Sequence, residues 1–182
     1  MVIHGFRRKL AESKAAQRDT DISIIKASIA GCVKVEKTDE NTDRTGVDYI
    51  ATLRRGGEIL IDAKNRERGA SRYWQDGKPE LALEIWSVMP ESDRQGVVGW
   101  TLNEATAVDY ILYTFDEADT DECYLIPYQL LRMALIRQYK RWVESYGIRI
   151  QHSPRWRSMA IFVPAREVLE AVSNEMFTKG VI

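Results

Sequence analysis

The chain has 182 residues, of which 45% are hydrophobic and 29% charged, and its formal net charge is −1. This length and composition exclude the disordered and fibrous classes and fit one folded domain over residues 1–182. No stretch approaches the roughly 20 consecutive apolar residues of a membrane helix, and the N-terminal segment carries charges where a signal peptide has its apolar run. We therefore expect a cytoplasmic protein.

The predicted elements begin with one or two helices over residues 8–31. A break or cap is expected near Thr20 and Asp21, and an end at Gly31. Alternating or apolar β-rich runs then predict strands over 32–38, 47–53, 58–64, 80–88, 107–115 and 123–127. The helical spacing of apolar residues predicts a helix from Tyr128 to Tyr146, which Gly147 ends.

A strand pair over 148–153 and 159–165 and a final amphipathic helix over 166–177 complete the chain. This order of helix, strands, helix, strands and helix predicts an α/β fold with a mixed central β-sheet that helices flank. Because the chain has no GxGxxG or Walker-type loop, the nucleotide-binding versions of this architecture lose their main support.

The runs over 47–53 and 58–64 are separated by Arg-Arg-Gly-Gly and predict a hairpin. Strand alternation places Asp62 and Lys64 on one face. Asp48 lies on the partner strand, directly opposite Asp62 if Leu53 pairs with Gly57, and shifted by one residue if Leu53 pairs with Glu58.

Two carboxylates that converge repel each other, and a hard cation such as Mg²⁺ or Mn²⁺ neutralises them. Mg²⁺ commonly binds one or two carboxylates together with phosphate oxygens, so a phosphodiester substrate fits. Lys64 would then orient or help to deprotonate the attacking water. The alternative is an ordinary solvated hairpin face with a cross-strand ion pair.

These residues resemble the PD-(D/E)XK nuclease superfamily, whose core is a helix followed by strands that carry an Asp and then a (D/E)-x-K triplet. Here these are Asp48 and the triplet Asp62-Ala63-Lys64. The resemblance covers about the first half of the chain and departs from the family name at Val47, where Pro would stand. It implies a restriction-endonuclease-like fold, similar to that of the Holliday-junction resolvases.

The resemblance also implies further site residues. The backbone carbonyl of Ala63 would reach the metal, and one acid of the first helix would join it, with Glu12, Asp19 and Asp21 as the candidates. Asp21 is included among the metal ligands, although its alternative role is a helix cap. Glu84, in the next strand, would act as an accessory ligand or help Lys64; alternatively it faces solvent.

Two basic segments have the makeup of a nucleic-acid surface, because cations meet phosphates there and aromatic rings can stack on bases. One is the loop with Arg66, Arg68 and Arg72, and the other is the predicted turn with Arg155, Trp156 and Arg157. The alternative for each is a solvated surface.

The predicted function is a Mg²⁺- or Mn²⁺-dependent nuclease that hydrolyses phosphodiester bonds in DNA, with RNA as another substrate to consider. One alternative is a catalytically silent member of the same fold that binds nucleic acid or protein, as an inhibitor or assembly factor. A second is an RNase or a junction-specific resolvase, and a resolvase would need a homodimer to cut symmetrically.

Overall fold

The computed structural model describes residues 17–39, 46–66, 74, 77–91, 95–116 and 122–178. A helix over 17–28 comes first. It is followed by β1 (Cys32–Lys37), β2 (Tyr49–Leu53), β3 (Glu58–Arg66), β4 (Glu80–Val88), β5 (Val97–Val98), η3 (Trp100–Leu102), β6 (Tyr110–Phe115), β7 (Cys123–Pro127), α3 (Tyr128–Tyr146), β8 (Arg149–His152), β9 (Arg157–Pro164) and α4 (Ala165–Thr178). The predicted α/β class and the helix from Tyr128 to Tyr146 are confirmed. No helix in these described ranges is long and apolar enough to cross a membrane.

The break predicted near Thr20 and Asp21 is wrong, because the helix continues through both residues. The Asp21 side chain is buried and bonded to residues of the fold instead of capping a helix end. A short polar side chain commonly caps a helix end, but Asp21 accepts hydrogen bonds from Gln17 in the same helix and from Tyr49 in β2.

The strands form two sheets, where the sequence predicted one central sheet. Their orders are β1-β2-β3-β6-β7 and β5-β4-β9-β8. β1, β2 and β3 pair antiparallel, but the bonds from Asp109 N to Leu60 O and from Asp116 N to Arg66 O show that β3 and β6 run in the same direction. The first sheet is therefore mixed. The second arises because β4 pairs with β9, far along the chain.

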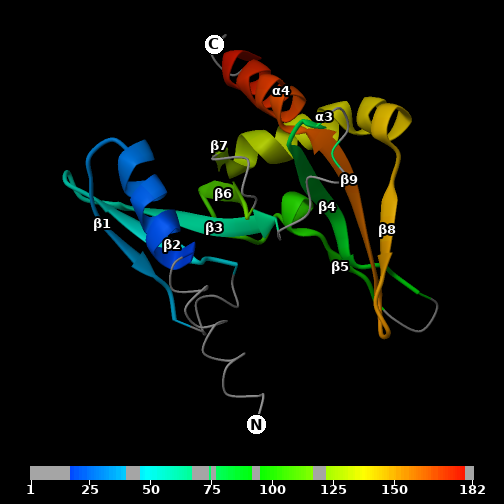
Figure 1. Cartoon of the computed structure of the whole chain (residues 1–182), viewed down its shortest axis with the longest axis horizontal. Helices are drawn as coiled ribbons and strands as arrows, with labels where there is room; N and C mark the ends of the chain where they lie inside the picture. The colour runs from blue at the N-terminus through cyan, green and yellow to red at the C-terminus, as the bar shows by residue number, and fades with distance from the viewer. Residues whose placement is uncertain are drawn as a thin grey trace. The chain divides into compact units, whose positions relative to one another are not determined.

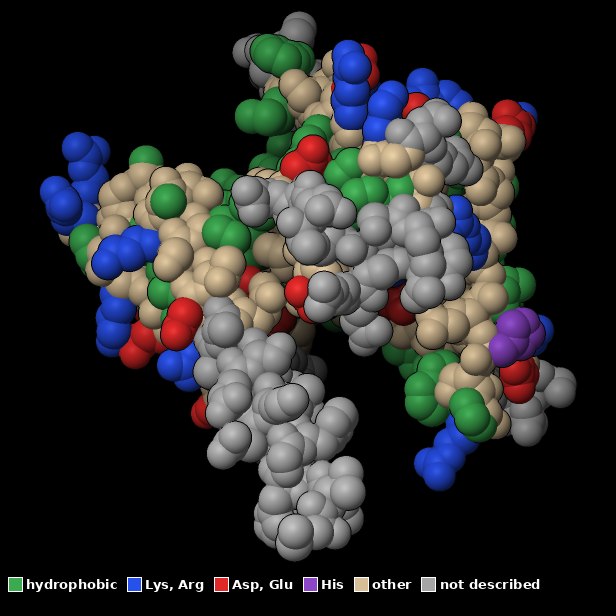
Figure 2. All heavy atoms as spheres, viewed as in Figure 1, with side chains coloured by type: hydrophobic (Ala, Val, Ile, Leu, Met, Phe, Trp, Pro, Cys, Tyr) green, Lys and Arg blue, Asp and Glu red, His purple; other side chains and the backbone are tan. Residues whose placement is uncertain are grey.

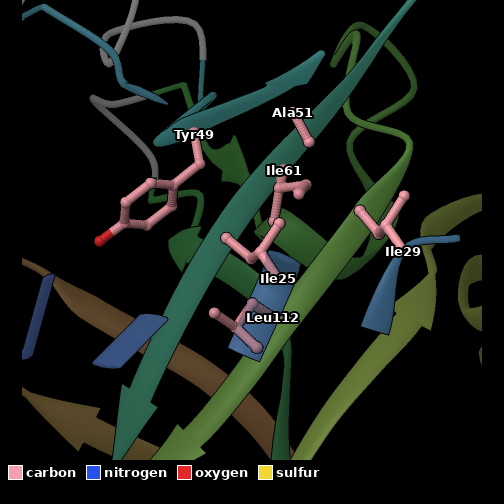
Figure 3. Packing of buried hydrophobic residues seen from close by; sticks show 6 residues of the cluster. All are labelled: Ile25, Ile29, Tyr49, Ala51, Ile61 and Leu112. Carbon is pink, nitrogen blue, oxygen red and sulfur yellow. The ribbon is translucent and has the colours of Figure 1, made fainter. Parts of the chain in front are cut away.

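The chain divides into two compact units. The first comprises 1–64, 107–114 and 123–125, and the second 65–106, 115–122 and 126–182. In the first unit the helix over 17–28, blue in Figure 1, lies along β1, β2 and β3. A buried apolar cluster joins this helix to β2, β3 and β6 (Figure 3). Its members are Ile25, Ile29, Tyr49, Ala51, Ile61 and Leu112.

In the second unit, α3 and α4 pack against the antiparallel sheet (Figure 1). Leu81, Leu83, Ile161 and Val163 alternate along β4 and β9 and are fully buried, so they form the covered face. The residues between them, such as Ala82 and Phe162, point to the other face.

Gly99 lets the segment before η3 approach β4 closely. Its N–H donates to Ile85 O at 2.8 Å, and a Cβ built on it would lie 2.3 Å from Glu84 O. Any side chain would collide with backbone, so glycine is required to bring Trp100 beside Glu84.

Candidate active site

The β2–β3 hairpin brings Asp48 next to Asp62. Leu53 N bonds to Gly57 O at 3.1 Å, and the strand pairing runs from Thr52 with Glu58 to Tyr49 with Ile61. Gly56 and Gly57 adopt φ values of 85° and 92° in the turn. The predicted pairing of Leu53 with Gly57 is therefore confirmed. The pairing ends at Tyr49 with Ile61, and Asp48, whose N also bonds to Ile61 O, lies just beyond it.

Hydrogen bonds on both sides fix Asp48. Its backbone N donates to Ile61 O, and its O accepts from Thr38 N, both at 2.9 Å. Its side-chain Oδ2 accepts from Ala63 N at 2.8 Å. The carboxylate is thus held against the backbone of the Asp62-Ala63-Lys64 triplet.

Asp62 and Lys64 form a partly buried ion pair on one face of β3. Lys64 Nζ lies 2.7 Å from Asp62 Oδ1, with the Lys64 side chain 30% exposed and that of Asp62 8%. Burial raises the pKa of Asp62 to about 7, against the opposing effect of Lys64, and the neighbouring Asp48 carboxylate raises it further. Asp62 therefore exchanges its proton near neutral pH.

Asp21 is joined to Tyr49 rather than to Asp62. Tyr49 Oη donates to its Oδ2 at 2.9 Å, and Gln17 Nε2 donates to its Oδ1 at 2.8 Å. Burial raises the pKa of Asp21, the two hydrogen bonds oppose that rise, and Asp48 adds to it. In Figure 3 the Tyr49 hydroxyl points away from the other labelled residues, at the edge of the core.

The role of Tyr49 was missed at the level of sequence. Strand alternation alone indicates that it faces away from Asp48 and toward the helix-covered side. A buried tyrosine needs a hydrogen-bond partner for its hydroxyl, and the nearest acid of the helix supplies one. That pairing was not recognised because the two residues are far apart in sequence.

The chemistry of Asp48 and Asp62 fits a hard divalent cation. Both supply oxygen donors, and Asp62 is buried with its pKa raised toward neutrality, in part by the neighbouring Asp48 carboxylate. Among the described residues, no three or more His, Cys, Asp or Glu side chains are grouped so as to hold a metal. Two carboxylates are nevertheless within the number that Mg²⁺ commonly takes from a protein.

The remaining predicted acids are not brought into this pair. Asp19 has an exposed side chain, 3.8 Å from Arg18, and Glu12 lies outside the described residues. Glu84 belongs to the second unit, where its Oε2 accepts from Ser87 Oγ at 2.5 Å and from Trp100 N at 3.4 Å. A catalytic role for Glu84 stays a prediction.

The predicted basic turn is the tip of the β8–β9 hairpin. Ser153 N bonds to Trp156 O across the turn at 2.8 Å, and Trp156 is 44% exposed. Arg157 Nε lies 3.4 Å from Glu91. Figure 2 shows hydrophobic and basic side chains near the purple histidine of this hairpin. Arg66 lies at the end of β3, whereas Arg68 and Arg72 fall outside the described residues.

Comparison with known proteins adds no relative. No family model, no curated protein and no solved structure matches the chain.

Proposed function

We propose that the first unit is a Mg²⁺- or Mn²⁺-dependent nuclease of the PD-(D/E)XK type that hydrolyses phosphodiester bonds in DNA. The observation that carries the proposal is that the Asp48 carboxylate accepts a hydrogen bond from Ala63 N, between Asp62 and Lys64, whose side chains form an ion pair. An Asp is disfavoured inside so apolar a strand, and its position beside a second carboxylate is typical of a functional site.

Asp48 and Asp62 would bind the cation, with the carbonyl of Ala63 as a further oxygen donor by analogy with the family. When bound, Mg²⁺ supplies Lewis-acid stabilisation of the charge on phosphate oxygens. Asp62 is buried, and a cation beside its carboxylate would favour the ionised form and lower its pKa from about 7. Asp21, whose two oxygens each accept one hydrogen bond, stays a predicted further ligand, because each carboxylate oxygen has a second lone pair.

Lys64 has two roles in the proposal. Its ammonium, 2.7 Å from Asp62 Oδ1, would hold the attacking water by donating a hydrogen bond to it. The same charge would offset the negative charge that develops on the phosphate. Because the Lys64 side chain is partly exposed, a substrate can reach its ammonium group.

The basic residues of the second unit support DNA as the partner. Arg66, Arg155 and Arg157 would contact phosphates, and the exposed Trp156 offers a surface on which a base can stack. RNA has the same phosphate charge, so the cleavage assay compares DNA and RNA as substrates.

The test combines Mn²⁺ titration calorimetry with cleavage of duplex, single-stranded and branched DNA and of RNA. Asp48→Asn and Asp62→Asn should abolish Mn²⁺ binding and cleavage. Lys64→Gln should keep binding and lower the cleavage rate about 100-fold or more, as the loss of one stabilising donor does. Glu36→Gln is the matched control, because Glu36 is an exposed carboxylate on β1 paired with Lys34.

Folded Asp48→Asn and Asp62→Asn proteins that cut as fast as the parent would overturn the proposal. Metal binding without cleavage of any substrate would favour the silent member of the fold. Cleavage restricted to branched DNA, by a protein that light scattering shows to be a dimer, would identify a resolvase.

A further inference from the structure

The second unit contains a pocket of about 580 Å³ on the face of its sheet that α3 and α4 leave uncovered. Its walls include Arg66, Glu84, Trp100, Arg149 and Phe162. Register explains how they meet, since Arg149 pairs with Ala160 and Ala82 with Phe162. The size lies within the roughly 300–1,000 Å³ of small-molecule sites.

One wall of the pocket carries two arginines, of which Arg149 also lies 3.6 Å from the buried Glu80 carboxylate. The guanidinium carbons of Arg66 and Arg149 lie 4.9 Å and 4.4 Å from the centre of the Phe162 ring. The Nε of Arg66 is buried and has no hydrogen-bond partner among the described residues. A buried, charged donor without an acceptor is costly, and an anion such as a phosphate would satisfy it.

The same pocket also contains a carboxylate, that of Glu84. Both hydrogen bonds described for the Glu84 carboxylate, from Ser87 Oγ and Trp100 N, are made to Oε2. The other oxygen is therefore available to a donor on a ligand that enters the pocket. A bare anion would be repelled by this carboxylate, so the pocket calls for a ligand that carries both an anion and N–H donors.

We propose that this pocket binds a guanine nucleotide. The phosphate would lie against Arg66 and Arg149, and the base would stack on Trp100 with its edge toward Glu84. Guanine carries N–H donors at N1 and N2 side by side, and the two lone pairs of Glu84 Oε1 can accept from both. The other bases place an acceptor beside each donor on that edge, and an acceptor repels the carboxylate.

The proposal goes beyond the nuclease reading and does not depend on it. The pocket lies wholly in the second unit, and its proposed ligand binds without a metal. A free nucleotide and a guanosine within a single strand share the same recognition chemistry, whereas the paired edge of a base in a duplex is not accessible.

The test is calorimetric titration of the whole chain with 5′-GMP, AMP, guanosine and inorganic phosphate, with EDTA present. 5′-GMP should bind, and each of the other three should bind at least about tenfold more weakly, the effect of losing one charge-assisted contact. A single-stranded oligonucleotide with one guanosine that binds more tightly than 5′-GMP would identify a strand as the ligand. Equal affinity would identify the free nucleotide.

Three variants, each checked for folding by circular dichroism, test the roles. Arg66→Gln should reduce 5′-GMP affinity about tenfold and leave guanosine binding unchanged. Glu84→Gln should remove the preference for 5′-GMP over AMP. Arg166→Gln, at an exposed arginine of α4, should change neither. Absence of 5′-GMP binding, or binding that Arg66→Gln and Glu84→Gln leave intact, would overturn the proposal. Because no divalent metal is present, either result is independent of the nuclease test.

Discussion

The Asp48 carboxylate accepts a 2.8 Å hydrogen bond from the backbone N–H of Ala63, the residue that separates Asp62 from Lys64. A side chain of β2 thereby fixes the backbone between two proposed site residues of β3. This contact couples the position of one carboxylate to the orientation of the other, so a change at Asp48 should be detected at Asp62.

Asp48→Asn should lower the pKa of Asp62 from about 7, because Asp48 is one of the groups that raise it. The measurement is a carbon-13 NMR titration of the Asp62 carboxyl group in the metal-free protein. Glu36→Gln should leave the Asp62 titration unchanged. An Asp62 pKa that stays the same or rises in Asp48→Asn would show that the two carboxylates do not interact.

The stability of the metal-free protein should fall as pH rises from about 4 to about 7, through the contribution of Asp62. In the unfolded chain this carboxyl loses its proton near the ordinary value of 3.8, whereas in the folded protein it keeps the proton until about 7. The unfolded state binds fewer protons in that window, and the free energy of unfolding therefore decreases with pH.

Urea unfolding at both ends of this window, for the parent and Asp62→Asn, isolates the contribution. The parent should lose more stability than Asp62→Asn between the lower and the higher pH. Equal losses in the two proteins would mean that the pKa of Asp62 is not raised in the folded state.

Mn²⁺ should raise the melting temperature of the parent above pH 7, because the proposed site binds it only in the folded state. A concentration 100 times the dissociation constant corresponds to about 2.7 kcal/mol. EDTA should reverse the shift, and Asp62→Asn should not show it. A shift of the same size in Asp62→Asn would place the binding elsewhere.

Tyr49→Phe should reduce the free energy of unfolding by about 1–3 kcal/mol, because it removes a hydrogen bond from the buried Asp21 carboxylate. Tyr139→Phe, at an exposed tyrosine of α3, is the matched control. A double-mutant cycle with Asp21→Asn should give a coupling energy between the two positions. Loss of Mn²⁺ binding in a stable Asp21→Asn protein would instead support Asp21 as a metal ligand.

Gly99→Ala should destabilise the second unit by about 1–3 kcal/mol, the usual cost of overpacking, because its Cβ would meet the backbone of Glu84 and Ile85. Thermal unfolding measures the loss, and near-ultraviolet circular dichroism should report a changed environment of Trp100. Unchanged stability and spectrum would show that the segment before η3 does not pack closely on β4.

Local signals predicted much of the fold, including the pairing of β2 with β3. The glycine pair at Gly56 and Gly57 requires positive φ values, and the turn they make sets the pairing of β2 with β3. The apolar spacing between Tyr128 and Tyr146 predicts a helix with the bounds that the structure has. In each case, the relevant information lies within a few residues of the chain.

What the sequence did not predict depends on contacts between distant residues. Hydrophobic alternation marks β4 and β9 as strands, but it does not say that Ala82 pairs with Phe162, and so it does not predict a second sheet. The same is true of the pocket, where Arg66 and Arg149 meet on one ring. The helical run of residues around Asp21 likewise gave no sign of its bond to Tyr49.

The proposed chemistry depends on the number of residues in the β2–β3 turn more than on which residues these are. Opposite residues of paired strands share a face, and successive residues of one strand alternate faces. A single residue inserted between Leu53 and Glu58 would, unless a bulge absorbed it, shift the pairing by one residue. Asp48 would then face a core residue of β3 instead of lying next to Asp62. Substitutions in that turn that respect its two glycines should leave the carboxylates together, whereas a one-codon insertion or deletion should separate them.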